Sequence, residues 1–169
     1  NCHVDFRPEQ AFFWNDKNEK EYFNKWEVYG QADQALNYLD HIDKDKPFAL
    51  IVSFHPPHDW GQFKGEDGNL HFKYDSIDEL MALYNRDSIK VRPGMKTSPD
   101  LKRMYHGYMA MVSGVDKAFG LLMKKLKDIG EEENTLTIFC ADHGDMLESH
   151  HTYKPKQYVH DYSSRIPFI

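Results

Sequence analysis

An acidic residue and a histidine follow directly on an apolar run near the end of the chain. The run covers residues 136–141, and the two polar residues are Asp142 and His143. A carboxylate oxygen and a neutral imidazole nitrogen can bind one divalent cation side by side. The run has the composition of a buried strand, and open α/β sheets place their sites at the carboxyl ends of such strands. The sequence therefore predicts a metal site at Asp142 and His143. The alternative interpretation is a strand that ends in a polar turn.

A second candidate for chemistry is His58, which follows Pro56 and Pro57. Proline fixes the backbone φ angle, so two prolines stiffen the turn and set the direction of the imidazole. With an ordinary pKa of about 6.5, a histidine in this place can donate a hydrogen bond or act as a general acid. The alternative role is a turn histidine packed on Trp60.

The elements that position these residues follow from hydrophobic periodicity. Apolar residues predict an amphipathic helix over residues 31–42, and a buried strand over residues 48–54 comes after it. Ser98 and Pro99 are typical of a helix start. Apolar residues then recur every three or four positions as far as Gly130, a typical helix end. The sequence thus predicts one long helix just before the apolar run that leads to Asp142.

Two regions lack a clear period. Residues 1–29 are aromatic and polar, and we expect a loop with a short helix there. Residues 59–98 are polar and rich in glycine, which is typical of a long functional connection, and residues 79–84 fit a helical turn within it.

Composition restricts the class of protein. In 169 residues, 40% are hydrophobic and 14% are aromatic, which indicates a folded globular chain. A net charge of −6 argues against nucleic-acid binding. No apolar run approaches the roughly 20 residues that span a bilayer. Cys2 and Cys140 cannot form a disulfide framework, and Cys140 is expected to be a buried packing residue.

Several segments resemble the formylglycine-dependent sulfatases of the alkaline phosphatase superfamily. Their pattern reads D-[HN]-G-D-x-L-G-x-H, then a lysine, then R-[IV]-P. Here residues 142–150 read D-H-G-D-M-L-E-S-H, and residues 165–167 read R-I-P. Residues 51–58 resemble a family segment that ends Pro-Pro-His, and residues 105–116 resemble the helix before the strand. The resemblance implies an α/β fold, a three-layer α/β/α sandwich of the alkaline phosphatase and sulfatase type, present here as an incomplete part.

The resemblance also implies an activity and a cofactor. The activity is hydrolysis of a sulfate monoester, with Asp142 and His143 as ligands of Ca²⁺ or Mg²⁺. The implied nucleophile is a formylglycine made from a Cys or Ser in a C/S-x-P-x-R motif. Neither Cys2 nor Cys140 lies in such a motif. Residues 1–169 are therefore expected to be part of a single catalytic domain that lacks an N-terminal nucleophile segment and a C-terminal subdomain.

Three further positions take roles from the same resemblance. His58 is expected to be catalytic and to contact the sulfate. The family has one lysine in the site, which falls on Lys156 or, counted from the other side, on Lys154. His150 is a candidate substrate contact. The implied substrate is a sulfated carbohydrate or an aryl sulfate, and relatives of this kind are exported, to the periplasm or outside the cell, or lysosomal.

Other readings stay open on the residues alone. A phosphodiesterase or phosphonate monoester hydrolase of the superfamily would share the metal pair and differ in the nucleophile. A zinc-dependent phosphatase or nuclease would suit the softer Asp-His pair. A non-catalytic domain could retain the fold without the chemistry.

Overall fold

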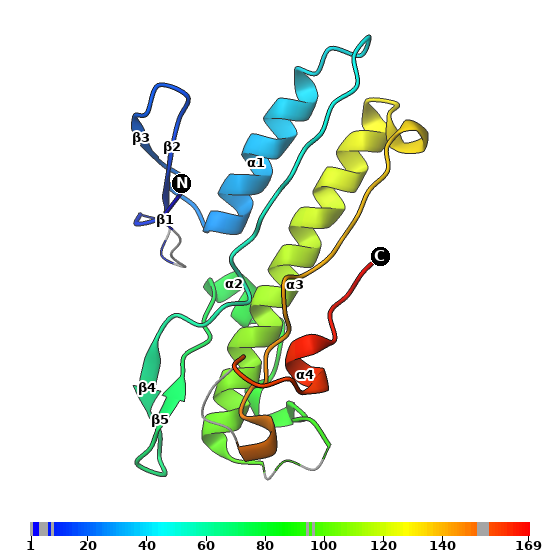
Figure 1. The fold of residues 1–169 in the computed structure, drawn as a ribbon. Coiled ribbons are helices and arrows are strands. Elements are labelled where there is room, and N and C mark those ends of the chain that lie inside the picture. Colours follow the sequence, from blue (N-terminus) through cyan, green and yellow to red (C-terminus); the bar gives the residue numbers. More distant parts are fainter. Residues whose placement is uncertain (1, 4–6, 8, 94, 96, 152–155) are drawn as a thin grey trace.

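The computed structural model describes residues 2–3, 7, 9–93, 95, 97–151 and 156–169. Two long helices, α1 and α3, lie side by side and run in the same direction, and extended segments pass along them (Figure 1). The elements in chain order, with η for short 3₁₀ helices, are β1 (Cys2–His3), β2 (Phe12–Trp14), β3 (Lys20–Tyr22), α1 (Glu27–Asp40), β4 (Gln62–Lys64), β5 (Leu70–Phe72), α2 (Asp78–Met81), η1 (Arg86–Ser88), α3 (Pro99–Asp128), η2 (Glu132–Asn134), η3 (Ser149–His151) and α4 (Asp161–Ser164).

The long helix α3 begins and ends where its sequence predicts. The Ser98 hydroxyl accepts a hydrogen bond from the Leu101 amide at 3.1 Å, which caps the first turn. At the other end Gly130 has a φ of +78°, and its N–H donates to the Lys127 carbonyl at 3.0 Å. The next N–H, from Glu131, reaches back to the Leu126 carbonyl at 2.9 Å. This pair of bonds is a Schellman motif, which requires a left-handed residue that glycine supplies without strain.

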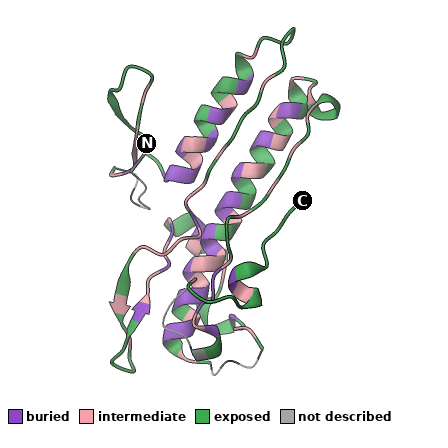
Figure 2. Ribbon diagram, in the orientation of Figure 1, coloured by how far each residue is buried: buried purple, intermediate pink, exposed green. Residues whose placement is uncertain are grey.

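Helix α1 begins earlier than the predicted range of 31–42, at Glu27, and ends at Asp40. Its first turn contains the fully buried Glu27 and Val28. A buried carboxylate interrupts the apolar period, so the periodicity conceals this first turn. Farther along, Ala35 and Leu39 pack against Leu122 and Leu126 of α3. Figure 2 shows buried residues along the facing sides of the two helices.

Two small antiparallel sheets occupy regions in which loops were expected. Strands β1, β2 and β3 form one sheet, and β4 pairs with β5 in a hairpin. At the tip of the hairpin, Gly68 has a φ of +81°, and the Asn69 amide donates to Asp67 Oδ1 at 2.9 Å. The sequence prediction for residues 1–29 and 59–98 missed these strands because strands this short have no long alternating pattern. The helical turn expected at residues 79–84 is present as α2 (Asp78–Met81).

The two predicted buried strands are extended but largely exposed. Ile51, in the segment 48–54, is 93% exposed. In the segment 136–141, Cys140 forms an isolated bridge with Phe168, and it is exposed rather than buried as expected. An apolar run predicts which surface a strand can bury, but burial needs a neighbouring element that covers it. Within the described residues, the backbone partner of the second segment is the 168–169 stretch.

No helix in the described part of the chain is both long and apolar enough to cross a membrane.

Candidate functional site

Asp142 and His143 lie where the extended segment 136–141 ends. The Asp142 carboxylate is 87% exposed, and its Oδ2 lies 3.5 Å from Nε2 of His143. The backbone N–H of His143 donates to Asp142 Oδ1 at 2.9 Å, which holds the carboxylate in place. The two side chains therefore point toward one another, as two ligands of one ion do.

The proton arrangement of His143 suits a metal ligand. Its Nδ1 lies 2.8 Å from the Gly144 carbonyl oxygen, so the Nδ1–H donates to that carbonyl. The other nitrogen, Nε2, faces Asp142 and is the atom left for a metal ion, which is the usual arrangement of a metal-binding histidine. The donor set of one oxygen and one nitrogen fits part of a divalent-cation site. Ca²⁺ takes six to eight ligands, so Asp142 and His143 would supply only a share of them.

The buried carboxylate of Asp145 links the segments around this pair. Its Oδ2 accepts a hydrogen bond from the Tyr74 hydroxyl at 2.8 Å, and its Oδ1 accepts one from the Leu147 amide at 2.9 Å. Burial raises the pKa of Asp145 above its usual range, although both hydrogen bonds and the charge of Lys156 act in the opposite direction. The charge of Asp59 also raises this pKa. Asp145 is thus the point at which three distant parts of the chain interact.

His58 lies after the Pro56–Pro57 bond, which is cis. Its Nδ1 is 2.9 Å from the Asp59 carbonyl oxygen and 3.4 Å from Asp59 Oδ2. The ring stacks on His55 at 4.6 Å between centroids, and it is His55 that packs edge-on against Trp60 at 5.0 Å. The His58 side chain is 42% exposed, so it is accessible to a ligand.

The remaining predicted residues differ in their placement. Lys156 is half-buried and interacts electrostatically with Asp145, which places its charge near the D-H-G-D segment. Lys154 lies outside the described residues. His150 is exposed, and its ring stacks on that of His160 with 4.5 Å between centroids. The centroid of the Tyr162 ring lies 5.8 Å from that of His150. The structure thus brings Asp142 and His143 within 3.5 Å of each other, and it places the charges of Lys156 and of Asp59, the neighbour of His58, near enough to Asp145 to shift its pKa in opposite directions. The chemical roles of all six residues stay predictions.

Arg92 is a cation near these residues that the sequence did not single out. Its guanidinium Nη1 donates to the Met146 carbonyl at 2.8 Å and to Ser149 Oγ at 3.1 Å. The guanidinium also lies 4.2 Å above the ring centre of Tyr162. A single arginine in a polar connection has no local signal, and only the fold brings it to the loop that follows Asp142.

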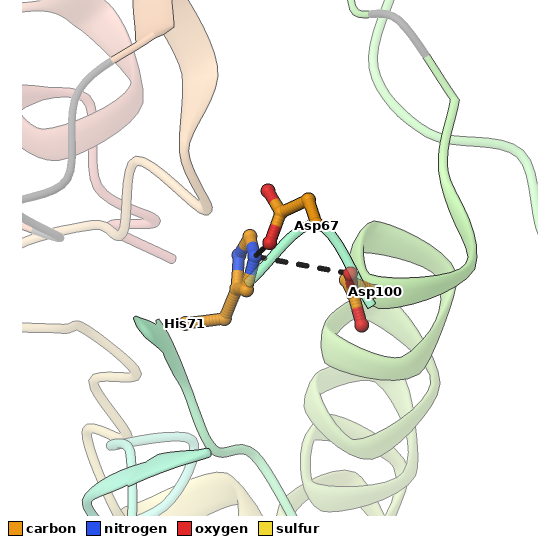
Figure 3. Close-up of side chains that lie close together, drawn as sticks. All are labelled: Asp67, His71 and Asp100. Atoms are coloured by element: carbon orange, nitrogen blue, oxygen red, sulfur yellow. Dashed lines mark hydrogen bonds and ion pairs between the residues drawn. The ribbon is translucent and has the colours of Figure 1, made fainter. Parts of the chain in front are cut away.

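A second cluster of ionisable side chains surrounds His71, to which the sequence gave no role. His71 Nε2 lies 3.0 Å from Asp67 Oδ1 and 3.9 Å from Asp100 Oδ2, and Figure 3 shows the ring facing both carboxylates. Its Nδ1 lies 2.7 Å from Oε1 of Glu148. Burial raises the pKa of Glu148, whereas the hydrogen bond with His71 lowers it. The pair Asp67 and His71, four residues apart across a hairpin tip, is the one local signal that could have indicated this cluster.

Comparison with known proteins identifies the relatives of this chain. The family model described as Sulfatase matches residues 3–169. The chain is 28% identical over 165 residues to the endo-4-O-sulfatase of Bacteroides thetaiotaomicron, covering 93% of this chain and 30% of that protein. It is 30% identical over 173 residues to the ulvan-active sulfatase of Formosa agariphila, covering 99% of this chain and 31% of that protein. The chain therefore spans about a third of the length of these relatives.

Solved structures give the same result for the fold. A Bacteroides thetaiotaomicron protein, solved in a study of the metabolism of multiple glycosaminoglycans, superposes with a TM-score of 0.79 at 27% identity. This match covers 96% of the present chain and 33% of that one. The Bacteroides fragilis sulfatase candidate yidJ superposes with a TM-score of 0.77 at 26% identity, covering 99% of this chain and 36% of the other. The expected fold class, an incomplete α/β fold of this type, is confirmed.

Proposed function

The chain belongs to the sulfatase family, and on that premise we propose that it is part of an enzyme that hydrolyses sulfate monoesters. The observation that carries this proposal is the family match over residues 3–169, which includes Asp142 and His143 in their facing arrangement. We further propose that the chain is one part of a single catalytic domain, in which the nucleophile and the other metal ligands come from another segment. The pair of Asp142 and His143 supports this, because two protein ligands are too few for Ca²⁺.

Each predicted residue has a physical role in this proposal. A divalent cation bound by Asp142 and His143 would neutralise charge on the sulfate oxygens. Lys156 would hold a sulfate oxygen as negative charge develops on it. His58 would donate a proton or hydrogen bond to the departing alkoxide oxygen. Its side chain is 42% exposed, and the contact between its Nδ1 and the Asp59 carbonyl oxygen holds the ring in place. Lys154 and His150 are proposed as further contacts of the substrate.

The substrate class rests on the relatives. Several of them are named for sulfated carbohydrates, including the ulvan-active sulfatase and an N-acetylglucosamine-6-O-sulfatase of Bacteroides thetaiotaomicron, and another is an arylsulfatase of Clostridium perfringens. We therefore propose a sulfated carbohydrate or an aryl sulfate, acted on through formylglycine chemistry. The expectation of an exported or lysosomal protein stays a prediction.

The test uses the longer protein that contains this chain. Hydrolysis of 4-nitrophenyl sulfate and of a sulfated sugar is measured for the wild type, for Asp142→Ala and for a matched control, Asp116→Ala, in which the lost carboxylate is exposed on α3. We expect Asp142→Ala to lower kcat by about 100-fold or more, because charge stabilisation in the site is lost. Asp116→Ala should retain the wild-type rate. Unchanged hydrolysis by Asp142→Ala would remove the metal assignment.

Two measurements on the same longer protein distinguish the rival activities: hydrolysis of other esters and metal content. Preference for bis(4-nitrophenyl) phosphate over the sulfate ester would favour the phosphodiesterase, and one relative is a multifunctional protein of the alkaline phosphatase superfamily at 25% identity. Two zinc ions per active site in place of a single Ca²⁺ would favour the zinc phosphatase. Absence of turnover on all these esters by the longer protein would favour a non-catalytic domain.

A further inference from the structure

Three distant segments meet at His71. The β4–β5 hairpin contributes Asp67 from its tip and His71 from β5, and the first turn of α3 contributes Asp100. One ligand atom from each of these three residues lies within 4.8 Å of the other two. The loop that follows Asp142 adds Glu148 on the other side of the ring. A cluster assembled from this many elements is fixed by the tertiary fold and not by a local turn.

Glu148 orients the imidazole. The carboxylate lies 2.7 Å from His71 Nδ1 and accepts the Nδ1–H. On the other side of the ring, Nε2 lies at hydrogen-bond distance from Asp67 Oδ1, 3.0 Å, and 3.9 Å from Asp100 Oδ2, so the Nε2 proton is the one that a metal ion would replace. A carboxylate that orients a histidine from behind, with oxygen donors in front, is the pattern of a metal-binding histidine.

The backbone of Gly65 lies close to the donor atoms. A Cβ on Gly65 would lie 2.6 Å from Asp100 Oδ2 and 2.7 Å from His71 Nε2. The φ of Gly65 is not in the left-handed region, so the backbone conformation does not demand glycine there. Glycine is required there because any side chain would collide with both donors, so the backbone of the hairpin packs directly against this cluster.

The carboxylates around His71 also carry an excess of negative charge, which favours the binding of a cation. Asp67, Asp100 and Glu148 all pair with His71, which carries at most one positive charge against three negative ones. The His71 and Asp100 side chains are buried, so solvent screens this excess poorly. A divalent cation in front of the ring would bring the cluster close to neutrality.

We propose that Asp67, His71 and Asp100 bind a divalent transition-metal ion of the zinc type, with Glu148 orienting His71. Ligands at about 2.1 Å in a tetrahedral site are about 3.4 Å apart, and the separations of 3.0 Å and 3.9 Å lie on either side of that value. An imidazole nitrogen in the set favours zinc over Ca²⁺ or Mg²⁺. The Asp67 side chain is 48% exposed, which provides the entry path. The ion would tie the hairpin to the start of α3, a structural role that does not depend on sulfate hydrolysis.

The test is a titration of the protein with zinc alone, read by calorimetry and by metal content after dialysis. Because Asp67 is on the surface, Asp67→Asn should fold, and it removes one charged ligand. We expect its zinc affinity at this site to fall about tenfold or more, and Glu148→Gln to lower it roughly 10- to 100-fold. The matched control is Asp87→Asn, another exposed aspartate in a short turn, which should bind zinc as the wild type does. In the Asp142→Ala background, zinc should also raise the Tm less for Asp67→Asn than for the control.

A second set of variants distinguishes zinc binding at His71 from zinc binding at Asp142 and His143. All titrations are repeated in Asp142→Ala, and Asp67→Asn should lower the zinc affinity by the same factor there. The ring nitrogens of His71 give an independent readout, because nitrogen NMR distinguishes a metal-bound Nε2 from an imidazolium. Equal zinc binding by the wild type and Asp67→Asn, or a His71 ring that stays doubly protonated in excess zinc, would overturn the proposal.

Discussion

The hydrogen bond between Tyr74 and Asp145 gives the sharpest test of how the site is held. Tyr74 is 3% exposed, and its hydroxyl donates to Asp145 Oδ2 at 2.8 Å inside the protein. Tyr74→Phe removes the hydroxyl and leaves one buried carboxylate oxygen without that donor. Hydrogen bonds to charged groups contribute about 1.5–3 kcal/mol, so we expect the free energy of unfolding to fall by about 2 kcal/mol.

Urea denaturation at pH 7 measures this loss. With an m-value near 2 kcal/mol/M, the midpoint should fall by about 1 M. Tyr38→Phe is the matched control, because Tyr38 is 43% exposed on α1, and its stability should change by less than about 0.5 kcal/mol. A double-mutant cycle with Asp145→Asn should show that the two changes are not additive. If Tyr74→Phe unfolds at the wild-type midpoint, or if the cycle gives no coupling, the inference that this bond fixes Asp145 is wrong.

Four further predictions concern helix α3 and the buried tyrosine hydroxyls. Gly107→Ala should destabilise the protein by about 1–3 kcal/mol, because its Cβ would lie 2.0 Å from the Tyr74 carbonyl oxygen. In the same helix Gly120→Ala meets nothing within 4 Å and should stabilise by roughly 0.5–1 kcal/mol in the same urea assay. Ser98→Ala should cost about 1 kcal/mol, since the helix cap is lost, and an unchanged urea midpoint would contradict the capping role. Burial raises the pKa of both Tyr74 and Tyr108, so above pH 10 the unfolded chain loses protons that the folded chain keeps, and stability should fall as the pH rises further. Alkaline unfolding with absorbance at 295 nm checks this, and a stability that stays constant above pH 10 would refute it.

The elements that the sequence predicted well are those that local interactions determine. Helix α3 has its cap at Ser98 and its left-handed end at Gly130, and both signals act within one helical turn. The hairpin β4–β5 was missed, because its strands of three residues each carry no period, and their pairing depends on residues that are distant in sequence. The burial expected for Cys140 was wrong for a related reason, since burial depends on a covering element and not on the apolar run itself.

In the predicted site, too, some features follow from neighbouring residues and others depend on the tertiary fold. Asp142 and His143 are adjacent in the chain, so their types and order were enough to name them as a candidate pair, and the structure shows that Oδ2 of Asp142 lies 3.5 Å from Nε2 of His143. That the charges of Lys156 and Asp59 lie near the buried Asp145 depends on the fold, and no spacing in the sequence reports it.

The sequence by itself determined the family, the long capped helix and the residues that carry the proposed chemistry, because these depend on residue types in short contiguous segments. Only the tertiary structure decided three sets of contacts. The buried Asp145 accepts a hydrogen bond from Tyr74, and Arg92 donates to the Met146 carbonyl in the loop after Asp142. The carboxylates of Asp67, Asp100 and Glu148 lie around His71. Each of these contacts joins side chains from segments far apart in the chain. Their pairing depends on how the hairpin, the helix and the loop pack, which residue order alone does not report.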